Sequence, residues 1–212
     1  MSTFGDMQTR IANELKRTDL TSEIKLAIND AINDYDGNRF WFNEERDATA
    51  FTTVLGQEFY TVADAPVIAS MRHIDTATVF VFNSRWVMHF RTPQYMEWQS
   101  VNPSWNAIPE DWSYYNETIR LYPIPNGAYP VYLSGTMQIA PTPLSSDNDS
   151  NVWTNEAEQL IRYCAKRKMF SDLLRDPDQM QINKALEDNQ FNILQSETAK
   201  RGGPATIRPT QW

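Results

Sequence analysis

ATVFVFNSRWVMHF, residues 77–90, contains two runs of valine and aromatic residues on either side of a polar pair. Such residues favour β-strands, and the pair between them favours a tight turn. The stretch therefore predicts a β-hairpin that turns at residues 83–84. Outward from it, residues 48–140 hold further short strand-type runs, including a second hairpin that turns at residues 116–117. A short helix is predicted to begin after Thr92, between the two hairpins.

Helical periodicity flanks this strand region on both sides. Apolar residues recur at helical spacing over residues 24–35, and a weaker helical pattern precedes them over 7–15. After the strand region, the pattern predicts one helix over 153–169 and a last helix that begins at Pro177. We expect the last helix to pack through this apolar face: Ile182, Leu186, Ile193 and Leu194.

These patterns divide the chain into five parts and indicate an α+β fold. The parts are an N-terminal helix pair at 1–46, a β-rich insert at 47–140, a linker at 141–153, a C-terminal helix pair at 154–201 and an extended C-terminal arm at 202–212.

The chain is acidic, with 27 Asp and Glu against 19 Lys and Arg in 212 residues. Residues 47–153 hold ten acids and four bases, so the acidity is concentrated in the β-rich part. A protein that grips nucleic acid needs a basic patch, so this balance argues against a DNA-binding body. Cys164, the single cysteine, is expected to be a core residue. With no signal-peptide or membrane-spanning pattern, we expect a soluble protein made in the cytoplasm.

Catalytic signatures are scarce in the sequence. Its two histidines, His73 and His89, lie in predicted strands, and no nucleophile, zinc, dinucleotide or P-loop motif is present. We therefore expect no cofactor and no catalytic residues. A carboxylate pair for sugar hydrolysis needs no sequence motif, so that chemistry stays open. The tryptophans of the β-rich part could stack on sugars, and core or interface packing explains them equally well.

One stretch has the spacing of a calcium-binding loop. Asp147, Asp149 and Asn151 fall at positions 1, 3 and 5, and Glu158 falls at position 12. Position 6 requires glycine for a sharp turn, but Val152 stands there, and no helix enters the loop. The alternative is a solvated linker whose Asp and Asn residues favour turns.

Two further clusters are candidates for partner contact. The densest basic run consists of Arg162, Lys166, Arg167 and Lys168. It is either a solvated helix face or a surface that meets an acidic neighbour. The aromatic segment consists of Phe40, Trp41 and Phe42. It is either core or a subunit contact, and its position at a helix end favours core for at least two of the three.

The arm, GGPATIRPTQW, ends on an indole. Its glycines allow a hinge, and its prolines prevent a helix. Ile207 and Trp212 then serve as apolar anchors, with Pro209 between them, and Arg208 can donate to a carboxylate or carbonyl. A frayed terminus is the alternative.

Three stretches together resemble a known phage family. They are IANELKRTDLTSEIKLAINDAINDYDGNRFWFNEER (11–46), PEDWSYYNETIRLYPIP (109–125) and ALEDNQFNIL (185–194). In this order they look like the head-to-tail adaptor proteins of tailed phages, especially the head-completion ring of short-tailed phages. The most specific pieces are the first helix pair running into the aromatic segment and the P-x-x-W…I-R-L-Y-P-x-P element.

The resemblance implies a four-helix core, formed by the two terminal helix pairs, with a large antiparallel β insert between them. It also implies a ring of twelve copies between the portal protein and the tail nozzle or another tail protein, with a central channel for DNA. The C-terminal arm would hold the portal through Ile207, Arg208, Pro209 and Trp212. The expected place is the head-tail junction of the virion, where DNA passes without specific binding and no membrane is involved.

Two other function classes stay open beside this structural role. A tail-associated enzyme could cleave peptidoglycan with a carboxylate pair in the aromatic β region. A binding module for host-surface glycan would bind sugar without cleaving it. Cleavage of cell-wall polymer separates the enzyme from the other two classes, and saturable glycan binding separates the module from the adaptor.

Overall fold

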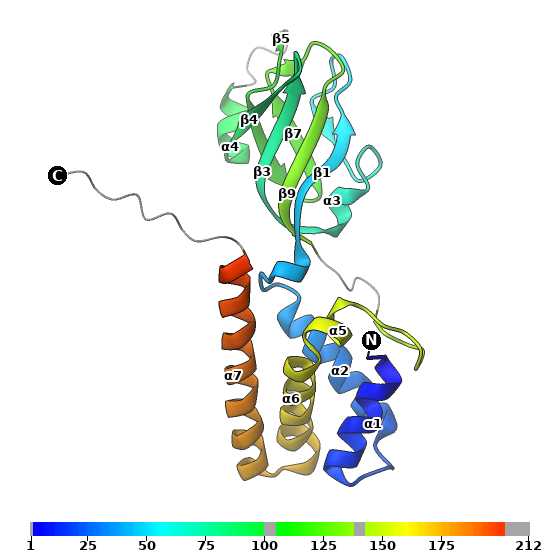
Figure 1. Ribbon diagram of the computed structural model, residues 1–212. Coiled ribbons are helices and arrows are strands. Elements are labelled where there is room, and N and C mark those ends of the chain that lie inside the picture. Colours follow the sequence, from blue (N-terminus) through cyan, green and yellow to red (C-terminus); the bar gives the residue numbers. More distant parts are fainter. Residues whose placement is uncertain (1, 100–104, 138–142, 202–212) are drawn as a thin grey trace, which may run out of the picture. The chain divides into compact units, whose positions relative to one another are not determined.

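Two compact units make up the computed structural model, which describes residues 2–99, 105–137 and 143–201 (Figure 1). The helical unit lies within residues 1–43 and 139–212, and the β unit lies within residues 44–138. The α+β class expected from the sequence is confirmed.

The elements follow one another in the order helices, strands, helices. Those of the helical unit are α1 (Phe4–Leu15), α2 (Thr21–Tyr35), η1 (Trp41–Asn43), α5 (Val152–Glu156), α6 (Glu158–Met169), the π-helical turn η2 (Phe170–Leu174) and α7 (Pro177–Arg201). Those of the β unit are β1 (Glu44–Thr52), β2 (Phe59–Tyr60), α3 (Val67–Ser70), β3 (Met71–Val81), β4 (Ser84–Phe90), α4 (Pro93–Gln99), β5 (Asn106–Ala107), β6 (Asp111–Tyr115), β7 (Thr118–Tyr122), β8 (Ile124–Pro125) and β9 (Pro130–Met137).

The core of the helical unit forms around α6. In Figure 1, α6 lies between α7 on one side and α1 on the other. Cys164 on α6 is fully buried, as expected for a core residue. Trp153 on α5 is also fully buried and packs edge-on against Phe40. The buried apolar residues of this core come from α1, α2, α5, α6 and α7: among others Met7, Ile11, Ile28, Ile32, Leu160, Ile161, Met169 and Leu194.

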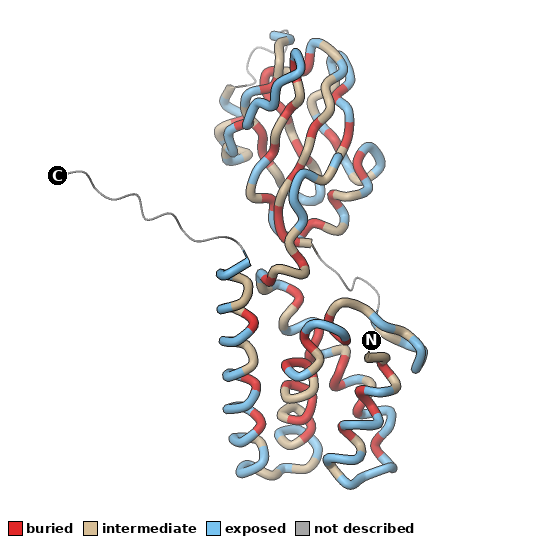
Figure 2. The backbone as a smooth tube through the Cα atoms, in the orientation of Figure 1, coloured by how far each residue is buried: buried red, intermediate tan, exposed pale blue. Residues whose placement is uncertain are grey.

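Burial was predicted for four apolar residues of α7, and the prediction is wrong for three of them. Leu194 is buried, but Ile182, Leu186 and Ile193 are exposed. The residues that α7 buries besides Leu194 are polar, Asn183 and Glu187. Figure 2 shows the buried residues of α7 on its side toward α6. The helix is therefore rotated away from the orientation that apolar periodicity predicts.

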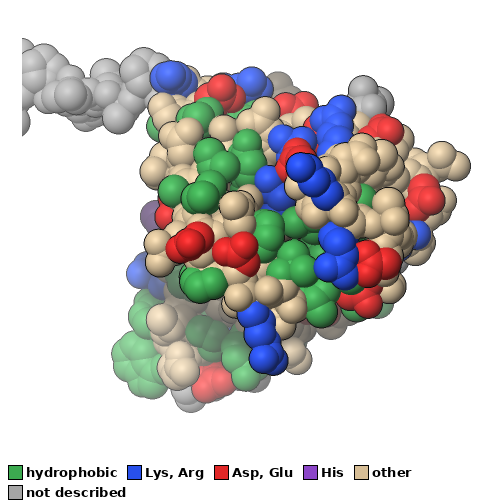
Figure 3. Space-filling view, turned by 90° about the horizontal axis from the view of Figure 1, so that it is seen from below, with side chains coloured by type: hydrophobic (Ala, Val, Ile, Leu, Met, Phe, Trp, Pro, Cys, Tyr) green, Lys and Arg blue, Asp and Glu red, His purple; other side chains and the backbone are tan. Residues whose placement is uncertain are grey.

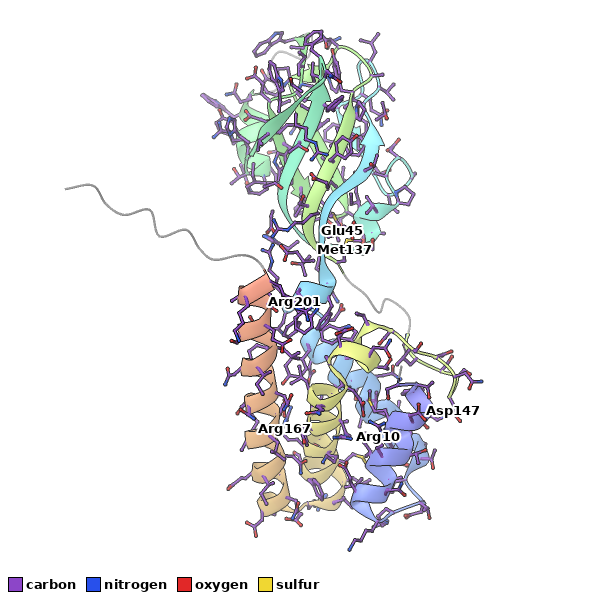
Figure 4. All side chains as sticks on the ribbon, in the orientation of Figure 1. Arg10, Glu45, Met137, Asp147, Arg167 and Arg201 are labelled. Atoms are coloured by element: carbon purple, nitrogen blue, oxygen red, sulfur yellow. The ribbon has the colours of Figure 1, made fainter. Side chains whose placement is uncertain are left out.

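A buried ionic cluster explains this rotation. The Glu187 side chain is only 3% exposed, and its carboxylate accepts from Arg167 Nε at 2.5 Å and from Tyr35 Oη at 2.6 Å (Figure 4 labels Arg167). Burial raises the pKa of Tyr35, and its hydrogen bond to Glu187 raises it further, so the phenol stays a donor. A buried charge is tolerated only when it is paired and hydrogen-bonded, so Glu187 must face these two groups.

The β unit is a curled sheet of seven strands in the order β1-β9-β3-β4-β6-β7-β2. The expectation of an antiparallel insert is wrong at two places. In the large sheet, β4 and β6 are parallel and pair His89 with Asp111. In a separate two-stranded sheet, β5 and β8 are also parallel. Between β4 and β6, α4 carries the chain across, and such a crossover lets the next strand enter in the same direction. Thr92 caps α4 through a 3.3 Å bond from Tyr95 N, so the helix predicted there is confirmed.

Both predicted hairpins form, and one turns a residue earlier than expected. In the β3–β4 hairpin, Val81 pairs with Ser84, so the turn residues are Phe82 and Asn83, both with positive φ. Positive φ at both central residues is typical of the two-residue turns that match the twist of the strands. The β6–β7 hairpin turns at residues 116–117, as predicted.

The first and last strands of the β unit are neighbours. β1 and β9 run antiparallel, and Glu44 pairs with Thr136 at the ends of the unit (Figure 4 labels Glu45 and Met137). Gly135 precedes Thr136 on β9, and a Cβ added to Gly135 would lie 2.0 Å from the His73 carbonyl oxygen on β3. Only glycine allows β3 and β9 to approach so closely.

Substitution of Arg167 by methionine should destabilise the protein strongly, because it leaves the buried Glu187 carboxylate without its ionic partner. We expect a loss of about 3 kcal/mol in the free energy of unfolding, measured by urea titration. The matched control is Lys184→Met, which removes the exposed Lys184–Asp188 pair on α7, the helix that carries Glu187. This change should lower the free energy of unfolding by less than about 0.5 kcal/mol. Equal effects of the two substitutions would contradict the importance of the cluster.

Candidate functional site

The basic run of α6 meets acids of its own chain. Lys166 Nζ lies 2.6 Å from Glu14, and Arg162 lies 3.5 Å from the same carboxylate. On the other sides of the helix, Arg167 binds Glu187 and Lys168 Nζ lies 2.8 Å from Asp34. These ion pairs join α6 to α1, α2 and α7. Each base of the run thus has an acidic partner within its own chain, and contact of the run with another protein stays a prediction.

The aromatic segment lies in and against the helical core. Phe40 is fully buried, stacks on Phe42 at 5.2 Å and contacts Trp153 edge-on at 5.7 Å. Trp41 and Phe42 are partly buried and pack against the same core. This is the core role that the sequence favoured for at least two of the three residues.

Trp41 also holds the end of α7. Its indole lies under the Arg201 guanidinium, 4.3 Å from the ring centroid, and its backbone N–H donates to Thr198 at 3.2 Å. Gln195 adds a 3.1 Å bond to the Arg39 carbonyl oxygen. The last described turns of α7 are thus fixed to the segment that leads into β1 (Figure 4 labels Arg201).

The four candidate calcium ligands do not converge. Asp147 accepts from Lys25 at 3.0 Å, and Asp149 accepts the backbone N–H groups of residues 145 and 146. Asn151 caps α5 by accepting Thr154 N at 3.0 Å. Glu158 forms two bonds with Arg10, at 2.7 and 2.9 Å (Figure 4 labels Asp147 and Arg10). Within the described ranges, no group of three or more His, Cys, Asp or Glu side chains could hold a metal ion.

The loop before α5 is closed against the helical unit. Asn29 on α2 exchanges two hydrogen bonds with the backbone of Leu144, at 2.9 and 3.1 Å. The N–H of Phe4, at the start of α1, donates to the Asp149 carbonyl oxygen at 2.8 Å. The Asp and Asn residues of this loop therefore form turns and caps, as the alternative to calcium binding requires.

The arm residues Ile207, Arg208, Pro209 and Trp212 lie outside the described residues. Their contact with a portal stays a prediction.

The β unit exposes several large apolar side chains, and the sequence had left its tryptophans open between sugar stacking and packing. Phe82 is 85% exposed, and Trp86, Val87 and Phe90 on β4 are also exposed. Trp98 on α4 adds a fifth large exposed side chain. The signal was present in the quoted hairpin, because its strands are apolar at consecutive positions, whereas a sheet of this kind buries one face.

A cavity of about 440 Å³ lies where the sheet opens between β3 and β6. His73 and Asp75 line it from β3, and Trp112 and Tyr114 line it from β6. His73 Nε2 lies 3.4 Å from Asp75 Oδ1. Among the described residues that line this cavity, Asp75 is the single carboxylate, so the structure does not assemble a carboxylate pair here.

The carboxyl groups with a displaced pKa are all displaced downward. They are Asp6, Asp19, Asp64, Asp147 and Asp149. In each, hydrogen bonds to the ionised form are the main cause; Arg17, for example, lowers the pKa of Asp19 to about 2. A general acid for sugar cleavage needs a raised pKa instead. These groups cap and close turns.

Comparison with known proteins gives one family. A family model described as SU10 adaptor protein matches residues 2–208. Among curated proteins, none matches the chain. None of the helices in the described part of the chain combines the length and apolar character that a bilayer-spanning helix needs.

Millimolar Ca²⁺ should leave the melting temperature unchanged, because the four candidate ligands are bound to four different sets of partners. A ligand stabilises a folded protein only if it binds the native state, and even weak calcium sites are occupied at millimolar concentration. The measurement is a thermal melt with Ca²⁺, with Mg²⁺ as the control. A rise in melting temperature that is specific for Ca²⁺ and lost in Asp147→Asn would contradict this expectation.

Proposed function

Because the chain belongs to the SU10 adaptor protein family, we propose that it is a structural subunit of the head-to-tail junction in a phage virion. In this role it docks on the portal protein and connects it to the tail nozzle or another tail protein. The family match carries the proposal, because it extends over nearly the whole chain, including both helical segments and the β unit between them.

We further propose that several copies, twelve by the family resemblance, form a ring that leaves a channel for DNA. The net charge of −8 supports this role, because an acidic wall repels the phosphate backbone and lets DNA slide. Ring contacts are heterologous and use two different surfaces of each subunit. A structural ring requires no catalytic residue.

The C-terminal arm is the part proposed to hold the portal. Support comes from the anchoring of α7, whose last turns bind residues 39–41 through Gln195, Thr198 and Arg201. An arm that starts from a fixed point loses less entropy on binding than one that starts from a frayed helix. Eleven residues can span up to about 36 to 40 Å when extended, enough to reach a neighbouring ring.

A glycan-binding module is the second candidate function. The observation that favours it is the exposure of Trp86, Trp98 and Trp105 on the β unit. Aromatic faces stack on sugars as well as on proteins. The peptidoglycan-cleaving alternative has no such support. Incubation with cell-wall polymer distinguishes the three: saturable binding without cleavage indicates the module, and cleavage that is lost when acids are neutralised indicates the enzyme.

Removal of residues 202–212 should abolish attachment to the portal and leave the fold intact. The arm lies beyond the last described turn of α7, so the circular dichroism spectrum and the melting temperature should not change. The measurement is co-sedimentation of the variant with its purified portal protein. Within the arm, Trp212→Ala should weaken attachment by about 2 kcal/mol, roughly thirtyfold, as expected for a buried aromatic anchor.

Gln211→Ala is the matched control and should attach normally. If the chain without the arm still attaches, the portal contact lies elsewhere on the subunit. If the full-length chain binds neither portal nor tail protein, the adaptor role itself is wrong.

A further inference from the structure

α7 presents three faces of different chemistry. Its buried face carries Asn183, Glu187 and Leu194 toward α6. A second face is solvated, and there Lys184 Nζ and Asp188 form an exposed ion pair at 2.7 Å. The third face is exposed and apolar, with Ile182, Leu186 and Ile193 at spacings of four and seven residues.

The apolar face of α7 has the composition of an interface centre. Between Ile182 and Ile193, a length of about 16 Å along the helix, the face continues through Ala185, Asn189 and Gln190 and carries no charged side chain. The centres of protein interfaces are depleted of charge and the rims are polar. A solvated helix face instead carries ion pairs, as the Lys184 side of the same helix does.

A second apolar surface lies on different elements of the helical unit. Leu26 on α2 is 65% exposed and Leu173 in η2 is 48% exposed, and both line a groove of about 230 Å³. With the three residues of α7, they are the large exposed apolar side chains of the described helical unit. Figure 3, a view from below, shows hydrophobic side chains among charged ones on the face that it draws.

The rim of the groove complements α7 chemically. Glu23 and Asp30 on α2 and Asp172 in η2 line it together with Leu26 and Leu173. Lys168 also lines the groove and is paired with Asp34 at 2.8 Å. Ionised carboxylates only accept hydrogen bonds. The apolar face of α7 offers donors in the amide groups of Asn189 and Gln190. Beyond Ile193 the same side of the helix carries one acid, Glu197, and one base, Lys200.

We propose that the apolar face of α7 in one copy binds the Leu26–Leu173 groove of a second copy of this chain. This proposal rests on the proposed ring and gives its subunit contact. Because the two surfaces belong to different elements, the contact is heterologous, and its repetition produces a ring, whereas a self-complementary patch would stop at a dimer. One helix in one groove buries less than a standard interface, so a single contact is weak and closure of the ring stabilises the assembly.

Cysteine cross-linking of the full chain on its purified portal tests the contact. The variants are Leu186→Cys and Leu26→Cys, one of them carrying a tag that changes its size, with a short bis-maleimide as the probe. The native Cys164 does not interfere, because it is fully buried and burial, with the nearby Glu187 charge, raises the pKa of its thiol to about 12. Circular dichroism verifies that each variant is folded.

We expect a mixed dimer of the two variants at a yield several-fold above that of either variant alone. Lys184→Cys, on the solvated face of the same helix, is the matched control and should give no mixed product with Leu26→Cys. Cross-linking of Leu186→Cys to itself at the same yield would overturn the proposal in favour of a symmetric contact. A portal-bound assembly without the mixed product would also overturn it and leave the ring standing. A wild-type chain that never self-associates on the portal would overturn the ring as well.

Discussion

Glu187 is the residue on which the arrangement of the helical unit depends. Its carboxylate is buried, and a buried charge without a partner would cost several kcal/mol. Only one rotation of α7 brings it to both Arg167 and Tyr35. That rotation turns Ile182, Leu186 and Ile193 toward solvent, while Leu194 stays buried and Phe191 packs on Tyr35 and Phe40. Apolar burial alone therefore does not determine how this helix packs. The exposed apolar face is a consequence of satisfying one charge.

The ionic contacts of α6 extend the same principle to the other helices. Lys166 and Lys168 bind acids of α1 and α2, while Arg167 binds α7. The Arg167–Glu187 pair adds a constraint on rotation and register to the apolar packing, because two nitrogens of the planar guanidinium meet the two carboxylate oxygens. The proposed role as a connecting subunit requires surfaces that are held in fixed positions. Specific ionic contacts between the helices meet that need.

Sequence periodicity predicted the elements well and their packing partly. The helix pairs, the short helix after Thr92 and both hairpins are present, because capping residues, prolines and β-branched runs act locally. The face of α7 could not be predicted, because periodicity assumes that apolar residues are buried and does not include Arg167, twenty residues away. The parallel pairing of His89 with Asp111 depends on a crossover between strands, which local patterns do not contain.

The β unit imposes little on the helical unit that carries it. Its first and last strands are adjacent and paired, Glu44 with Thr136, so the chain leaves and returns about one strand spacing apart. A host fold has to accommodate only that narrow gap, whatever the size of the inserted sheet. An inserted sheet of another size can therefore start and end on the same pair of strands and leave the helical scaffold unchanged.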